Sequence, residues 1–172
     1  MNPNIFITVT EDLDTIPINP TFNARLFGAS ADTTVNVLSD ADGNQGTATG
    51  IAQGATVQFT GNADAFSFGL DGNILEVTDA NGNLVAELAG GTTAGTLKFA
   101  DGSTTFGVGQ DADGNQAFTV GNEVVSADAP IDGATTDVIT DPDDESGITP
   151  DGPPAPTGPT FSVSEGSNVV DE

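Results

Sequence analysis

Between residues 35 and 125 the chain is a succession of short segments in which apolar side chains occupy every second position. Phe66 and Phe68 illustrate the pattern, as do Val57 and Phe59. A period of two is typical of strands with one buried face, and no window has the period of a helix. The sequence therefore predicts an all-β fold, with strands over residues 35–38, 55–60, 65–70, 74–78, 84–88, 96–99, 104–108 and 116–120.

The intervals between these segments carry Gly next to Asn or Asp. Asn81-Gly82 is the strongest turn signal, followed by Asp71-Gly72 and Asp101-Gly102. These residues tolerate the positive φ that tight hairpins require. Hairpins favour an antiparallel β-sandwich, whereas the Gly-containing run near Gly28 would suit a short β-solenoid. Both architectures, each with a hairpin meander, stay open at this point.

Three regions are expected along the chain. Residues 1–126 form the all-β domain, which begins with an alternating strand and then passes through Pro17 and Pro20 in an irregular or edge segment. The core is of modest size, so most apolar positions are interpreted as packing residues. Residues 127–159 contain seven of the ten prolines and no basic residue, which predicts a disordered acidic linker. Residues 160–172 alternate again, like the start of a further β module or a strand donated to a neighbour.

The charge of the chain is strongly one-sided. It has 26 acidic residues and two basic ones, Arg25 and Lys98, for a net charge of −24. Nucleic acids and anionic membranes need basic residues to neutralise phosphates, so neither is an expected partner. No apolar run reaches the length of a membrane span. Self-repulsion at this charge calls for cations, supplied either by bound divalent metal or by a saline medium.

The chain contains no Cys, His, Trp or Tyr. Their absence excludes thiol nucleophiles, disulfides and every catalytic arrangement that depends on His. Paired carboxylates could still act on sugars, but Phe is the only aromatic residue present to stack on them. A non-enzymatic protein is therefore expected.

One hexapeptide, Asp-Ala-Asp-Gly-Asn-Gln, occurs at 40–45 and again at 111–116. Oxygen-bearing side chains at alternate positions of a tight loop can converge on Ca²⁺. The predicted ligands are Asp40, Asp42 and Asn44, and Asp111, Asp113 and Asn115. The loops lack the sixth-position Gly and the twelfth-position Glu of an EF-hand. The alternative interpretation is a hairpin turn in which these side chains bond their own backbone.

Residues 26–108 resemble modules of large bacterial surface proteins of the RTX adhesin and S-layer type. The similarity rests on LFGASADTTV (26–35), VQFTGNADAFSF (57–68), GNILEV (72–77) and LKFADGS (97–103). The calcium-binding nonapeptide of RTX proteins is absent, so no Ca²⁺ ligands are transferred to residues 28–35. The resemblance implies type I secretion and a structural or adhesive role at the cell surface.

These observations lead to two expected functions. The first is a structural, self-associating module of an extracellular surface layer, fibre or giant adhesin, with other copies or neighbouring modules as partners. The second is an adhesin domain that binds a carbohydrate or another ligand. For either role the expected location is the bacterial cell surface or matrix, because richness in Gly, Asn, Asp and Thr without Cys is typical of extracellular proteins of this kind.

Overall fold

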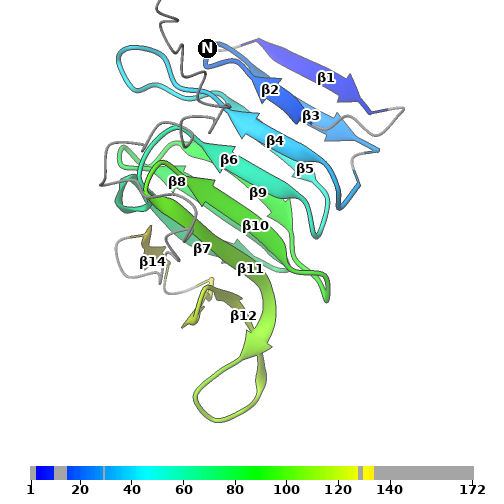
Figure 1. Ribbon diagram of the computed structural model, residues 1–172, viewed down its shortest axis with the longest axis vertical. Coiled ribbons are helices and arrows are strands. Elements are labelled where there is room, and N and C mark those ends of the chain that lie inside the picture. The colour runs from blue at the N-terminus through cyan, green and yellow to red at the C-terminus, as the bar shows by residue number, and fades with distance from the viewer. Residues whose placement is uncertain (1–2, 10–14, 29, 128–129, 134–172) are drawn as a thin grey trace, which may run out of the picture.

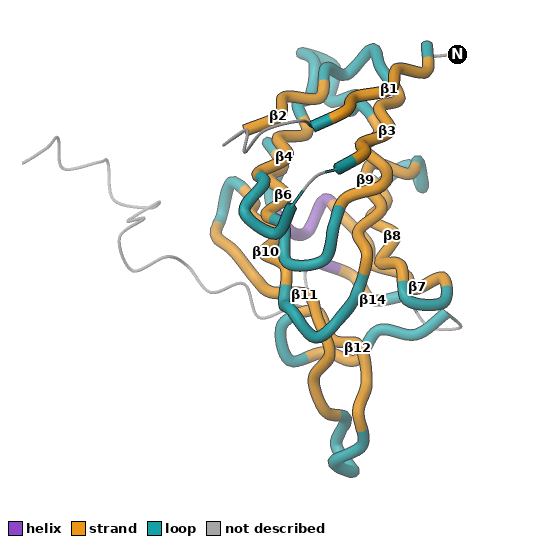
Figure 2. Tube along the Cα trace, turned by 90° about the vertical axis from the view of Figure 1, so that its right-hand side faces the viewer, coloured by secondary structure: helices purple, strands orange, loops and turns teal. Residues whose placement is uncertain are grey.

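The computed structural model describes residues 3–9, 15–28, 30–127 and 130–133. Two β-sheets lie face to face in these residues, as the edge-on view in Figure 2 shows. Each sheet has seven strands (Figure 1). The predicted all-β fold is confirmed. The predicted segment 160–172 and most of the predicted linker lie outside the described residues.

The strands of the two sheets are as follows. In spatial order the first sheet contains β1 (Asn4–Thr8), β3 (Asn23–Phe27), β5 (Thr47–Ile51), β9 (Leu84–Ala89), β8 (Ile74–Asp79), β7 (Phe66–Asp71) and β14 (Ile131–Asp132). The second contains β13 (Glu123–Val124), β12 (Gln116–Val120), β11 (Gly102–Gln110), β10 (Gly95–Phe99), β6 (Thr56–Phe59), β4 (Thr34–Val37) and β2 (Thr15–Ile18). A short 3-10 helix, η1 (Ala63–Ala65), precedes β7.

The N-terminal half is a short β-solenoid. The chain alternates between the sheets, so that β1, β3 and β5 stack in parallel in one sheet and β2, β4 and β6 stack in parallel in the other. Parallel pairing continues from β5 to β9 and from β6 to β10. Inward residues lie in register across the rungs; Ile16 of β2, for example, faces Val35 of β4, which faces Val57 of β6.

The C-terminal half is built from hairpins. Strands β7, β8 and β9 pair antiparallel, as do β10, β11, β12 and β13. The fold thus combines the two architectures that the sequence left open. The Asn-Gly and Asp-Gly signals identify the hairpins, whereas most of the parallel rungs are joined by longer loops.

The core lies between the sheets and is centred on phenylalanines. Phe59 of β6 and Phe99 of β10 stack with ring centroids 5.5 Å apart. Phe66 of β7 reaches across from the other sheet, with its ring 4.7 Å from that of Phe59 and 5.6 Å from that of Phe99. All three side chains are buried. The interpretation of these positions as packing residues is confirmed.

Some elements were not predicted. Strands β3 and β5 have no counterpart among the predicted segments, and β14 pairs with β7 beyond the predicted boundary at residue 126. Pro17 lies in β2, which is an edge strand, as the two prolines of this region indicated. In the described part of the chain, no helix has the length and apolar character needed to cross a bilayer.

Candidate functional site

The turn between β8 and β9 is held by the side chain of Asp79. Its Oδ1 accepts hydrogen bonds from the backbone N–H of Asn81 at 2.9 Å and of Asn83 at 2.8 Å. The Asn83 amide donates to the other carboxylate oxygen at 3.0 Å. The N–H of Gly82 closes the turn on the Asp79 carbonyl at 2.9 Å. One carboxylate therefore accepts from two backbone N–H groups and one side-chain amide of a five-residue turn.

The same turn occurs twice more, in both copies of the repeated hexapeptide. Asp40 accepts from the backbone N–H of Asp42 and of Asn44, each at 2.9 Å. The turn headed by Asp111 has the equivalent bonds at 3.0 and 2.8 Å. The shared pattern is Asp-Ala-Asp/Asn-Gly-Asn. Sequence reasoning missed its third copy at 79–83 because the third position there is Asn rather than Asp, although the other four residues are identical.

These hydrogen bonds also lower the pKa values of the carboxyl groups at the first position of the three turns, Asp40, Asp79 and Asp111. Hydrogen bonds from Asn44 and Asn115 lower the pKa values of Asp40 and Asp111, respectively. For Asp79 burial raises the pKa, but the bonds from Asn83 and Asn81 together outweigh it, so the net shift is again downward. Each carboxyl is therefore held in its charged form by its own turn.

A fall in stability at acid pH follows from these shifts. A carboxyl whose pKa is lower in the folded state adds stability above its unfolded pKa, near about 4, and that stability is lost as the pH falls through the folded value. We expect the melting temperature to decline between pH 5 and pH 2, measured by circular dichroism. The triple variant Asp40→Asn, Asp79→Asn, Asp111→Asn keeps an oxygen acceptor at each position but removes the titrating carboxyl. Its melting temperature should therefore fall less steeply with pH than that of the wild type. An equally steep fall would contradict the prediction.

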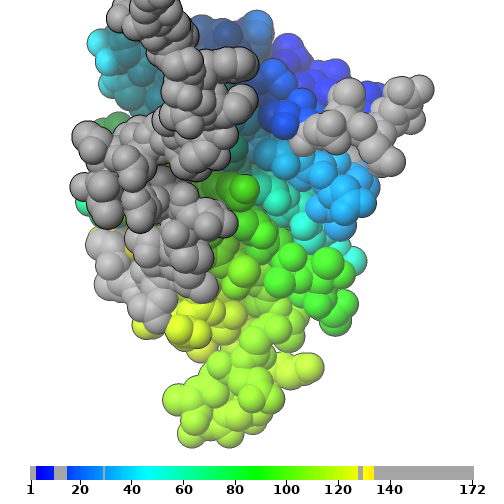
Figure 3. Space-filling view, viewed as in Figure 1, coloured from blue at the N-terminus to red at the C-terminus, as the bar shows by residue number. Residues whose placement is uncertain are grey.

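The predicted calcium ligands are only partly brought together. In each repeat the first and fifth residues, such as Asp40 and Asn44, are hydrogen-bonded to each other. The third residues, Asp42 and Asp113, are exposed and their carboxylates have no hydrogen-bond partner within the described residues. The two turns are far apart: the 40–44 turn follows β4, while the 111–115 turn ends the hairpin that projects beyond the body in Figure 3.

Calcium binding at these turns stays a prediction. The hydrogen bonds explain why Asp and Asn recur at the first and fifth positions without any cation. If Ca²⁺ binds the native turns, it should raise the melting temperature in proportion to occupancy. Scanning calorimetry in millimolar Ca²⁺ and in EDTA at equal ionic strength measures this. The double variant Asp42→Asn, Asp113→Asn gives both repeats the composition of the natural 79–83 turn, so Ca²⁺ should no longer raise its melting temperature. Equal melting temperatures of the wild type in Ca²⁺ and in EDTA would rule out calcium binding at these turns.

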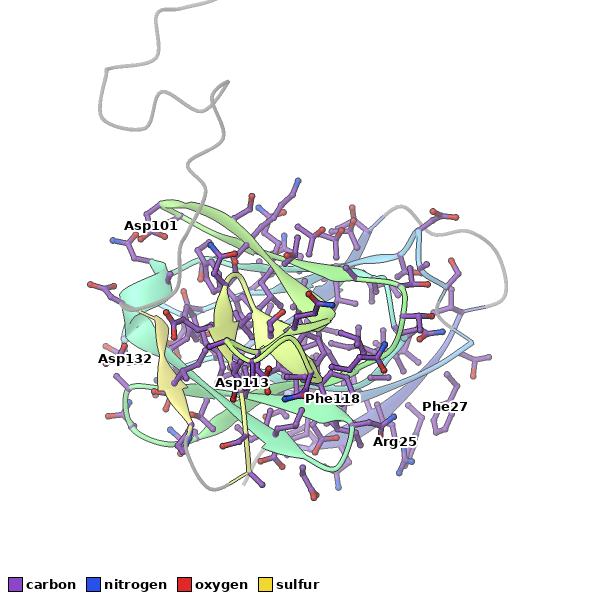
Figure 4. The ribbon with its side chains drawn as sticks, turned by 90° about the horizontal axis from the view of Figure 1, so that it is seen from below. Arg25, Phe27, Asp101, Asp113, Phe118 and Asp132 are labelled. Atoms are coloured by element: carbon purple, nitrogen blue, oxygen red, sulfur yellow. The ribbon has the colours of Figure 1, made fainter. Side chains whose placement is uncertain are left out.

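A second surface feature lies on the outer face of the first sheet, at its N-terminal end. Phe6 of β1 is 73 % exposed and Phe27 of β3 is 44 % exposed, with ring centroids 6.2 Å apart. The guanidinium of Arg25 lies 5.4 Å from the centroid of the Phe27 ring, within cation–π distance. Figure 4 shows Arg25 and Phe27 side by side at the margin of the molecule. These two phenylalanines are exceptions to the interpretation of apolar residues as packing residues.

A shallow groove of about 580 Å³ runs beside this pair. Among the described residues, its lining contains one charged side chain, Arg25, and no carboxylate. The lining residues are Asn4, Ile5, Phe6, Asn23, Ala24, Arg25, Thr47, Thr49, Asn83 and Leu84. On a chain with a net charge of −24, the described acidic residues near this groove lie at its margins: Asp79 is hydrogen-bonded to Asn83, and Glu87 borders a neighbouring hollow with Arg25.

Strand β1, which borders the groove, is also an open sheet edge. Natural proteins protect edges with short strands, charges or proline. Of the four edge strands in the described residues, β13 and β14 have two residues each, including Glu123 and Asp132. Strand β2 contains Pro17. Strand β1, with the sequence Asn-Ile-Phe-Ile-Thr, has five residues and none of these protective features.

The groove and the open edge are adjacent, and together they form the candidate site. We call the surface formed by Phe6, Phe27 and Arg25 with the free edge of β1 the β1 surface. Sequence reasoning identified Ile5 and Ile7 as members of a strand, but not that this strand ends a sheet. No family model matches the chain, and neither a characterised protein nor a solved structure shows significant similarity to it.

Proposed function

We propose that the chain is a non-enzymatic, self-associating structural module of an extracellular surface layer, fibre or large adhesin. The observation that supports this role is the unprotected edge of β1. A five-residue strand with an exposed aromatic side chain and no charge offers backbone donors and acceptors to another polypeptide.

The composition supports the same role. A molecule with no His, Cys, Trp or Tyr has few reactive or ligand-stacking side chains. Its net charge of −24 opposes contact between copies unless salt or bound cations screen it. An assembly that forms outside the cell in a saline medium meets this condition. The described residues that line the groove beside β1 include no acidic side chain, so the repulsion is locally reduced at this surface.

Light scattering tests the proposal through one edge substitution and one matched control. Phe6→Lys places a positive charge on the open edge, and a charged side chain is one of the usual ways in which natural proteins protect edge strands. Val108→Lys is the control: Val108 is 39 % exposed but lies on β11, an interior strand of the second sheet, where it pairs with Phe118 of β12. We expect the wild type and Val108→Lys to associate at millimolar protein concentration in saline buffer, and Phe6→Lys to stay monomeric. Association of Phe6→Lys equal to that of the control would refute the proposed role of this edge.

A ligand-binding adhesin domain is the second candidate, because the groove has the size of a ligand site. Its volume of about 580 Å³ lies within the range of small-molecule sites, and Arg25, Asn23 and Thr49 supply polar groups. A glycan array probed with labelled protein tests this function. Binding that is lost in Arg25→Ala, while the protein remains monomeric, would favour it over the structural role.

A further inference from the structure

We infer that β1 pairs antiparallel with β1 of a second copy, related by a two-fold axis that passes between the two Phe6 residues. This pairing would join two seven-stranded sheets into one continuous sheet. This inference rests on the proposed self-association and specifies its geometry. Three properties of β1 lead to it: the direction of its backbone groups, the distribution of its side chains, and the contrast with β2.

Within the described part of the chain, the backbone of β1 leaves one set of hydrogen-bonding groups open. The Val9 N–H donates to Phe27 in β3 at 2.8 Å, and the Pro3 carbonyl accepts from Asn23 at 3.0 Å. Odd-numbered residues therefore direct their N–H and C=O groups toward β3. In a parallel pair the intervening residues direct theirs to the opposite side. The open groups consequently belong to Asn4, Phe6 and Thr8.

These three residues suit an antiparallel partner with the same sequence. A two-fold axis at Phe6 places Phe6 opposite Phe6, and Asn4 opposite Thr8 of the second copy. All of these are hydrogen-bonded pairs, in which each residue exchanges both backbone bonds with its partner. Every open donor and acceptor of β1 is satisfied in this register.

The side chains are also self-complementary in this register. Asn4, Phe6 and Thr8 are on the exposed face, while Ile5 and Ile7 point inward and are only partly buried. Pairing sets Ile5 beside Ile7 of the second copy, so both lose solvent contact. On the outer face the two Phe6 rings become direct cross-strand neighbours, with the Phe27 rings behind them. Aromatic cross-strand pairs are among the side-chain pairs that stabilise sheets.

Strand β2, at the same end of the molecule, cannot pair in this way. The Ile18 carbonyl accepts from Leu38, the residue that follows β4, so the residues that face the free edge are Thr15 and Pro17. Proline has no N–H to donate, and its position removes a central donor from that edge. Only one of the two sheets can therefore extend into a second copy, which favours a closed pair over a continuous stack.

The interface is small, so the pair should be weak. Two five-residue strands bury less area than the roughly 1,200 Å² of a stable complex. We expect dissociation constants of about micromolar or weaker, with association that strengthens as salt screens the net charge of −24.

Cysteine cross-linking of the full chain tests this geometry, and the natural chain has no Cys to interfere. In the inferred pair the Phe6 Cα atoms are about 5.5 Å apart, within the range of a disulfide. Oxidised Phe6→Cys should therefore form covalent dimers. Thr8→Cys is the matched control, because its two copies would be about 14 Å apart. An equal mixture of Asn4→Cys and Thr8→Cys should form mixed dimers, which neither variant forms alone.

Each other outcome overturns the inference in a recognisable way. If the wild type associates but Phe6→Cys forms no more dimer than Thr8→Cys, self-association stands and the two-fold register is wrong. If the wild type and Phe6→Cys both stay monomeric, the proposed function fails as well. If the introduced thiol of monomeric Phe6→Cys resists maleimide labelling, another segment of the same chain covers β1.

Discussion

Phe66→Ala is expected to destabilise the fold by about 3–5 kcal/mol, which is much of the stability of a domain of this size. The Phe66 side chain is 1 % exposed and joins the two sheets through its contacts with Phe59 and Phe99. Without the ring, the favourable free energy of burying it is lost, and a cavity remains between the sheets. Each sheet is held in place by hydrogen bonds between its strands. Little collapse into that cavity is possible, so the loss should lie at the upper end of the range.

Urea denaturation monitored by circular dichroism measures this loss, at a protein concentration that keeps the chain monomeric. Phe6→Ala is the matched control because it removes the same ring from a site that is 73 % exposed. We expect the control to change the free energy of unfolding by less than about 0.5 kcal/mol. Similar losses for the two variants would show that the Phe59, Phe66 and Phe99 cluster is not the centre of the core.

The sequence predicts the strands that alternate strictly, since their inward residues are all apolar. Strand β7, with Phe66 and Phe68 both buried, is one example. Strand β5 fails this test. Its inward residues are Ala48 and Ile51, three positions apart, because the register shifts between them. A pattern search that requires a period of two cannot recognise a strand with such an irregularity.

The candidate site was less predictable than the fold. The repeated hexapeptide drew attention to Asp40 and Asp111, yet their geometry is that of a turn that also occurs at Asp79 without the second carboxylate. The β1 surface gave only a weak signal. In β1 the inward residues are Ile5 and Ile7, so Phe6 stands at an outward position, and Phe27 likewise follows the inward Leu26. That β1 ends the sheet is a consequence of strand order, which is a property of long-range pairing that no local pattern records.

The irregularity in β5 gives the second large prediction, which concerns Gly50. Its φ is +73°, a conformation that L side chains rarely adopt, and a Cβ atom there would lie 2.5 Å from the backbone oxygen of Leu26 in β3. Gly50 therefore allows the strand to bulge, so that Ile51 turns inward and becomes 1 % exposed. Gly50→Ala combines two penalties, backbone strain and a collision with the backbone of β3.

Gly82→Ala separates these penalties. Gly82 has nearly the same φ, +78°, but no heavy atom lies within 4 Å of its would-be Cβ. We expect Gly82→Ala to lose about 1–2 kcal/mol of unfolding free energy from φ strain alone. Gly50→Ala should lose about 2–5 kcal/mol, since overpacking adds to the strain. Urea titrations of both variants measure the difference. A larger loss for Gly50→Ala would show that the close approach of its Cβ to the Leu26 backbone adds to the φ strain. Equal losses of unfolding free energy in the two variants would show that the backbone of β3 moves to make room for the added Cβ. The stacked strands next to β1 would then be less rigid than their close packing implies.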